Sequence, residues 1–208
     1  MIDQIAAYRD EYQHVPRDGF FGWVDAEVLY AMVRILKPAR MIEVGAGNST
    51  RITAMALRAN NTACTFLTID PEPRSTLPDG VPHLRALVQS VSSEAFALGR
   101  DDILFIDSSH FYEPGSDVEY LLDKILPILP AGAVVHVHDI FLPYDYPADW
   151  AGRYYTEQYR LAEILETGDW EVLWSGHQMM KNERAAMLAA FPGVPETTDP
   201  GSFWMRRR

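Results

Sequence analysis

The chain has little of what disulfides, membrane spans and nucleic-acid surfaces are built from. Its one cysteine, Cys64, excludes an internal disulfide and a cysteine-based zinc site. No apolar run is long enough to cross a bilayer and no N-terminal segment resembles a signal peptide, so we expect a cytoplasmic protein without a membrane partner. Acidic residues (29) outnumber basic ones (18), which gives a formal charge of −11. We therefore expect no nucleic-acid partner, since phosphates are bound by a basic face.

What the chain does have is the composition of a globular protein. Its 208 residues are 48% hydrophobic and 23% charged, which fits one domain over residues 1–208. Helical and strand patterns alternate along the chain, which is typical of a mostly parallel sheet covered by helices on both faces. The fold class is therefore predicted to be α/β, with seven strands, the last two forming an antiparallel C-terminal hairpin.

Periodicity and turn residues set the expected elements. Strands are predicted at residues 41–44, 62–69, 84–88, 102–106, 133–137, 170–174 and 202–206. Helices are predicted at residues 24–36, 49–59, 92–98, 116–129, 153–166 and 183–190. Within the single domain, residues 1–38 are expected to form an N-terminal helical cap, and residues 141–160 an aromatic lid beside the substrate.

The most informative segment is residues 43–50, Glu-Val-Gly-Ala-Gly-Asn-Ser-Thr. Its two glycines permit a sharp strand-to-helix turn and the close approach of a ligand. The acid before them would repel a dinucleotide pyrophosphate but suits a ligand with a cationic amino group. The turn therefore favours S-adenosyl-L-methionine (AdoMet) over NAD. Taken alone, it also fits an ordinary strand–helix connection.

Acidic residues stand at the carboxyl ends of four predicted strands: Glu43, Asp70, Asp107 and Asp139. Ligands of open α/β sheets bind at this edge. A carboxylate is costly in a core but useful in a ligand crevice, and four at successive strand ends are not a common coincidence. We expect these acids to lie around one binding site.

Over about residues 40–140 the sequence resembles the class I AdoMet-dependent methyltransferases. Residues 43–49 match the first motif of that family, with Ser49 where a third glycine often stands. Together with Phe-Ile-Asp-Ser-Ser-His at 105–110 and Val-His-Val-His-Asp at 135–139, the motif is similar to the type 24 small-molecule methyltransferases, related to macrocin-type sugar O-methyltransferases. The resemblance implies a Rossmann-like, doubly wound fold and methyl transfer from AdoMet to a small-molecule acceptor, at a hydroxyl oxygen.

The resemblance also assigns cofactor contacts. It places Gly45 and Gly47 under the methionine part of AdoMet, and Asp70 at the ribose, where a carboxylate offers two acceptors to the diol. Gln89 and Ser90 fall where the adenine is held. The expected cofactor-binding set is Glu43, Gly45, Ala46, Gly47, Ser49, Asp70, Gln89, Ser90 and Asp107.

The catalytic candidates are Asp107, His110, His138 and Asp139, which follow two neighbouring strands. In one interpretation Asp107 and Asp139 bind a divalent cation such as Mg²⁺, which lowers the pKa of the acceptor hydroxyl. In another, His138 or His110 is the general base and a carboxylate fixes its tautomer. In a third interpretation the histidines have only a structural role. Ile140 stands where a strict metal motif would have another acid or amide, and the choice stays open.

Aromatic residues mark the substrate side. The loop at residues 141–150 is rich in aromatics and proline, and Tyr144, Tyr146 and Trp150 are the expected substrate contacts. Packing of the next helix onto the sheet is the alternative role of these rings. On the opposite side, residues 20–23 (Phe-Phe-Gly-Trp) are expected to close the cofactor pocket, although Trp23 could equally pack against the helix that follows. His136 is expected to be a core histidine on the same strand face as His138.

Two other functions compete with methyl transfer. A NAD-linked oxidoreductase is disfavoured by Glu43 and by Thr50, which stands where that fingerprint has its last glycine. An inactive AdoMet-binding protein is disfavoured by the intact acids and histidines. The sequence identifies neither the acceptor nor the oligomeric state, and it leaves a homo-oligomer open.

Overall fold

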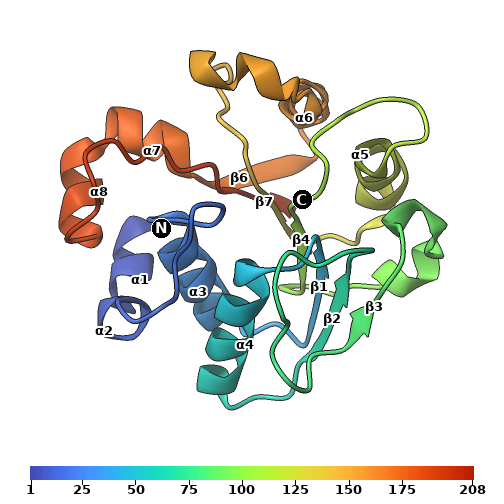
Figure 1. Ribbon diagram of the computed structural model, residues 1–208, viewed down its shortest axis with the longest axis horizontal. Coiled ribbons are helices and arrows are strands. Elements are labelled where there is room, and N and C mark those ends of the chain that lie inside the picture. The colour runs from blue at the N-terminus through green and yellow to red at the C-terminus, as the bar shows by residue number, and fades with distance from the viewer.

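A single seven-stranded sheet forms the centre of the molecule (Figure 1). The computed structural model describes residues 1–208. The strands are β1 (Arg40–Val44), β2 (Thr65–Ile69), β3 (His83–Leu84), β4 (Ile103–Ile106), β5 (Val134–Val137), β6 (Trp170–Ser175) and β7 (Phe203–Arg207). Their order is β3-β2-β1-β4-β5-β7-β6, in which β1 to β5 are parallel and β7 is antiparallel to both neighbours. The predicted mostly parallel sheet with an antiparallel C-terminal pair is confirmed.

The strand order reverses between β1 and β4. From β1 the chain proceeds outward to β2 and β3, and it then returns to β4 and proceeds the other way to β5. Val44 of β1 pairs with Ile69 and with Ile106, so these strands end level with one another. Such a switch point leaves a crevice beyond the carboxyl ends of the strands, where ligands bind in open α/β sheets.

Helices cover both faces of the sheet. They are α1 (Ile2–Ala6), α2 (Arg9–Tyr12), α3 (Asp25–Leu36), α4 (Asn48–Asn60), α5 (Asp117–Glu119), α6 (Glu157–Glu166), α7 (Gly176–Asn182) and α8 (Arg184–Ala190). A π turn at Tyr120–Ile125 and a 3₁₀ turn at Leu126–Ile128 extend α5, and three further 3₁₀ turns lie at Val88–Ser90, Ser93–Phe96 and Ala148–Arg153. None of the helices has the length and apolarity that a bilayer span requires.

Each face of the sheet has its own core, because neighbouring strand residues point to opposite sides. Met41 and Phe105 pack with α1, α3, α4 and α8, whereas Ile42 and Leu104 pack with the extended α5 and with α6. In Figure 1 the helices of the first face lie at the left and α5 and α6 at the right and top. The N-terminal helices also bind the C-terminal part of the chain, since the Tyr12 hydroxyl donates to the Ala190 carbonyl.

Four element predictions need correction, and one helix was missed. The helix expected at 92–98 is only the 3₁₀ turn Ser93–Phe96. The strand expected at 84–88 is only the two-residue β3, because Leu87 and Val88 turn away from the sheet and line a cavity. The helix expected from 153 begins at 157, after a left-handed residue, Tyr154 (φ 57°). Helix α7 was missed because seven residues are too few to show a period. Ser49 is no N-cap: α4 begins at Asn48, and the Ser49 hydroxyl donates to Glu43 instead.

Candidate active site

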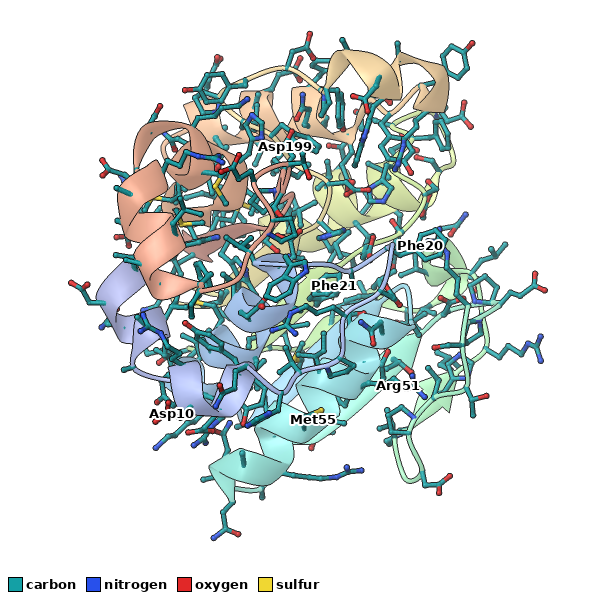
Figure 2. The ribbon with its side chains drawn as sticks, turned by 60° about the vertical axis from the view of Figure 1, so that its left-hand side comes forward. Asp10, Phe20, Phe21, Arg51, Met55 and Asp199 are labelled. Atoms are coloured by element: carbon teal, nitrogen blue, oxygen red, sulfur yellow. The ribbon has the colours of Figure 1, made fainter.

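A cavity of about 550 Å³ opens at the switch point of the sheet. Residues 45–49, 69–72, 87–89 and 107–109 line it from the strand ends, and residues 18–21 line it from the N-terminal segment. Figure 2 shows this segment, with Phe20 and Phe21 labelled, between Asp199 above and the α4 residue Arg51 below. Both phenylalanines line the cavity, as expected of a segment that closes the pocket.

The two positions of the turn require glycine for different physical reasons. Gly45 has φ +85°, and an added Cβ would lie 1.8 Å from the Asp107 carbonyl oxygen. Any side chain there would push β1 and β4 apart at their ends. At Gly47 an added Cβ would meet nothing within 4 Å, and the residue lines the cavity. Gly45 is therefore required by the protein's own packing, and Gly47 leaves space for a ligand.

Asp70 presents its carboxylate to the cavity in a fixed orientation. Its Oδ2 accepts from the Ala46 N–H (2.7 Å) and its Oδ1 from the Glu72 N–H (2.6 Å). Each carboxylate oxygen has a further lone pair, so the group can still accept two hydrogen bonds. The residue lines the cavity and suits a ligand with two neighbouring hydroxyls.

Glu43 lies beneath the turn and not in the cavity. Its side chain is fully buried, and its Oε1 and Oε2 accept from the hydroxyls of Ser49 (2.6 Å) and Thr50 (2.7 Å). Burial raises the pKa of Glu43 to about 8, against the lowering effect of those two hydroxyls. Glu43, which was expected to contact a cationic ligand, does not line the cavity. Glu43 holds the turn together, and Ser49 stands between it and the cavity.

The four catalytic candidates lie together, as expected. His110 Nε2 is 3.4 Å from Asp107 Oδ1 and 3.6 Å from Asp139 Oδ2. His138 Nδ1 is 3.6 Å from Asp107 Oδ1 and 3.4 Å from Asp139 Oδ1. One nitrogen of each histidine thus faces the same pair of carboxylates. Asp107 also lines the cavity, so the cluster and the cavity share a wall.

Two further acids complete the cluster, and neither was among the predicted catalytic residues. Glu157 Oε2 lies 2.9 Å from His110 Nδ1, and Asp25 Oδ2 lies 3.4 Å from His138 Nε2. Each is the first residue of its helix, α6 or α3. An acid in a first turn is ordinarily explained by the helix dipole, so no local pattern distinguishes these two.

The cluster separates the pKa values of its two central acids. Burial alone would raise the pKa of Asp107, but His138 and His110 hold it well below its usual range. Burial does raise the pKa of Asp139. Burial would lower the pKa values of both histidines, but the surrounding carboxylates raise them well above 6.5. Separated pKa values of neighbouring acids are typical of sites that move protons.

The backbone is strained at the same place. His110 (φ 65°) and Asp139 (φ 56°) both adopt the left-handed conformation that non-glycine residues rarely occupy. Gly201 packs so closely on Asp139 that an added Cβ would lie 2.9 Å from the Asp139 Cα. Strain of this kind persists where surrounding structure imposes it, and it concentrates at functional sites.

Comparison with known proteins shows which family and which solved structures the chain is similar to. Residues 42–140 match the family model described as a methyltransferase domain, type 24. The fold is similar to the S-adenosylhomocysteine-bound methyltransferase PaMTH1 of Podospora anserina, at 16% identity over 100% of this chain and 87% of that chain, with a TM-score of 0.55. It is also similar to an O-methyltransferase from Bacillus cereus in complex with S-adenosylhomocysteine, at 13% identity over 100% and 89%, with a TM-score of 0.57. No curated protein matches the sequence.

The matched segment runs from β1 to the end of β5 and contains the glycine turn, Asp70, Asp107 and the histidine–aspartate pair. The chain therefore contains an AdoMet-dependent methyltransferase domain at residues 42–140, on a fold similar to that of solved methyltransferases. Of the residues expected at its adenine, Gln89 lines the cavity, whereas Ser90 does not and donates its hydroxyl to the Leu87 carbonyl. Ile69 and Leu87 add apolar walls to the cavity, and neither was predicted to line it.

The expected substrate aromatics of the methyltransferase lie outside the cavity. Tyr146 and Trp150 pack edge-on against Phe141 at 5.9 and 5.0 Å between ring centroids. Tyr144 is exposed at 40% and donates to Asn182 Oδ1. Tyr155, which was not among the predicted substrate contacts, connects this group to the cluster of histidines and acids, since its ring centroid is 4.5 Å from that of His110.

His136, the histidine within β5, is a core residue. His136 is fully buried, stacks on Phe105 at 4.2 Å and faces the same side as His138, as expected. Burial holds its pKa well below 6.5, so it is neutral. No group of three or more His, Cys, Asp or Glu side chains is arranged as a metal site. Asp107 and Asp139, the two expected cation ligands, face histidine nitrogens.

Proposed function

We propose that this methyltransferase transfers the methyl group of AdoMet to a hydroxyl oxygen of a small molecule. The observation that carries the proposal is the shared wall at Asp107. This residue lines the cavity at the switch point and contacts the histidines that could accept a proton. The cavity volume of about 550 Å³ lies within the range of small-molecule sites, about 300–1,000 Å³.

The cavity residues match the parts of AdoMet. Gly47 leaves room for the methionine part, and Asp70 has two acceptor positions for the ribose diol. Ile69, Leu87 and Gln89 offer the apolar walls and the single amide that suit an adenine. Phe20 and Phe21 cover the site from the N-terminal side.

Bound AdoMet supplies an electrophilic methyl group, and the chain must align the acceptor, exclude water and take up a proton. We assign the proton to His110 Nε2, because the His110 ring lies beside Tyr155 on the side of the aromatic segment. The His138 ring lies beside Phe21, which belongs to the cofactor side. Since carboxylates raise the pKa of His110 above 6.5, the transfer rate should rise with pH as this histidine becomes neutral.

Calorimetric titration with AdoMet, S-adenosylhomocysteine and NAD is the first test. Binding of the two sulfur compounds and not NAD is expected, and binding of NAD alone would overturn the proposal. The second test incubates the protein with methyl-deuterated AdoMet and a panel of catechols, phenols and sugars, and detects products by mass spectrometry. Labelled methyl on oxygen supports the assignment. Transfer to nitrogen or carbon only would overturn the hydroxyl part.

A further inference from the structure

The two histidines of the cluster differ in how the nitrogen remote from Asp107 and Asp139 is held. His110 Nδ1 makes a hydrogen bond of 2.9 Å to Glu157 Oε2. His138 Nε2 is buried without a hydrogen-bond partner, 3.4 Å from Asp25. Asp25 is itself occupied, because its two oxygens accept from the backbone N–H groups of Gly201 and Ser202. The Glu157 side chain therefore fixes the ring of His110, whereas no hydrogen bond fixes the remote nitrogen of His138.

Glu157 has no other polar partner for its carboxylate. Its side chain is fully buried, and its Oε1 has no hydrogen-bond partner. A buried acid with one partner is costly to the fold, since burial penalises its charged form. Stability therefore does not explain why an acid stands here. An apolar residue of similar size would serve packing at least as well.

Backbone hydrogen bonds also connect His110 with Glu157. The His110 carbonyl accepts from the N–H groups of Thr156 (3.0 Å) and Glu157 (3.2 Å), at the left-handed turn that follows β4. The start of α6 thus holds both the main chain and the ring of His110. Because α6 follows the aromatic segment, the part of the chain expected to meet the acceptor is also the part that orients the histidine.

The hydrogen bond determines the tautomer of the ring. A carboxylate only accepts, so each ring nitrogen of His110 carries a hydrogen toward its carboxylates when the ring is charged. The 2.9 Å bond from Nδ1 to Glu157 is shorter than either contact of Nε2, so the neutral ring keeps its hydrogen on Nδ1, and Nε2 is the nitrogen that gains or loses a proton. That nitrogen is the one that lies 3.4 Å from Asp107 and 3.6 Å from Asp139. With the opposite tautomer, Nε2 would carry a hydrogen and could not take a proton from a hydroxyl.

We propose that Glu157 is a positioning residue: it holds His110 with Nδ1 protonated and Nε2 aimed at the acceptor hydroxyl. This inference rests on the proposed methyl transfer to oxygen. In that step the oxygen–carbon bond forms as the sulfur–carbon bond breaks, the sulfonium becomes a neutral thioether, and the hydroxyl proton passes to Nε2. Glu157 keeps its own proton state and touches neither reactant.

The first test needs no acceptor. Long-range ¹H–¹⁵N spectra of histidine-labelled protein, recorded at a pH above the His110 titration, report the tautomer of each ring. His110 is identified by the signal that disappears in His110→Gln. We expect Nδ1 to be protonated in the native protein and the tautomers to be mixed in Glu157→Gln. Unchanged His110 signals in Glu157→Gln would overturn the proposal, whether or not the proposed function holds.

The second test is kinetic, with an acceptor found in the panel. Glu157→Gln should lower kcat by about 10- to 100-fold, the scale of outer partners of functional histidines, and leave the Kd of AdoMet unchanged. In a double-mutant cycle, Glu157→Gln should have no further effect once His110 is Gln. Additive losses would overturn the proposal, because they would indicate a structural role.

Two variants complete the kinetic test. Glu166→Gln, on the exposed C-terminal turn of α6, is the matched control and should retain native kcat. Glu157→Asp retains a carboxylate and should recover part of kcat. It also replaces Glu157→Gln in the cycle if that variant does not fold. Should AdoMet itself fail to bind the native protein, the proposed function fails, while the tautomer measurement still decides the role of Glu157.

Discussion

The proposed cofactor half and the proposed acceptor half of the site, which meet at Asp107, are held together by different means. On the cofactor side, backbone geometry dominates: Gly45 permits contact with the Asp107 carbonyl, and backbone N–H groups orient Asp70. On the acceptor side, ionisable side chains from distant parts of the chain hold one another, as in the pair of His110 and Glu157. The cofactor half should therefore respond to small changes of shape, and the acceptor half to changes of charge and tautomer.

The largest effect is expected from a substitution that changes only the shape of the cofactor half. Gly45→Ala places a Cβ 1.8 Å from a carbonyl oxygen at φ +85°, so it should cost more than about 4 kcal/mol of unfolding free energy or prevent folding. Gly47→Ala is the matched control, because its Cβ meets nothing; it should change stability by about 0.5 kcal/mol at most and weaken AdoMet binding. Urea denaturation measures both. Equal stability of the two variants would contradict this account.

A smaller effect is expected when the carboxylate of Asp70 is removed from the cofactor half. Asp70→Ala should weaken AdoMet binding by about 100-fold or more, since two hydrogen bonds to a charged group are lost and each contributes about 1.5–3 kcal/mol. Isothermal titration calorimetry gives the value. Asp79→Ala, in the exposed loop after β2, is the control and should bind like the native protein. Native affinity in Asp70→Ala would disprove the ribose assignment.

Glu43 provides a test by pH. Its pKa is 4.5 in an unfolded chain and about 8 in the fold, so the folded state binds the proton more tightly. The stability that this gives is complete below 4.5 and is lost as the pH rises through about 8. A glutamine does not titrate, so Glu43→Gln does not lose stability in this way as the pH rises. Its free energy of unfolding relative to that of the native protein should therefore rise by a few kcal/mol from about pH 5 to about pH 9.

Urea denaturation at the two pH values checks this, with the exposed Glu94→Gln as control. A difference between Glu43→Gln and the native protein that does not depend on pH would show that Glu43 is not held by burial as described.

The smallest effect is expected from removing or adding a divalent cation. Because histidine nitrogens lie within 3.6 Å of both Asp107 and Asp139, we expect proton transfer to proceed through them. Dialysis against EDTA should then leave methyl transfer unchanged, and added Mg²⁺ should not raise it. Loss of transfer on chelation with recovery on Mg²⁺ would favour the cation at these acids instead.

The comparison also explains what the sequence could predict. The glycine turn, Asp70 and the cluster of Asp107, His110, His138 and Asp139 were found because each lies at the end of a predicted strand, and parallel strands end at one edge. Glu157 lies 47 residues from His110 in the chain and has no local motif. The burial of Glu43 beneath the turn was not predicted, because it depends on hydrogen bonds from the Ser49 and Thr50 hydroxyls that no sequence pattern indicates.

The division between the two halves is tested most directly by one variant, His110→Gln. AdoMet affinity and methyl transfer are measured on the same sample, by calorimetry and by transfer of labelled methyl to an acceptor from the panel. We expect an AdoMet Kd equal to that of the native protein and a kcat lowered by about 100-fold or more, the scale of general-base catalysis. Transfer at the native rate, or loss of AdoMet binding together with transfer, would contradict the account.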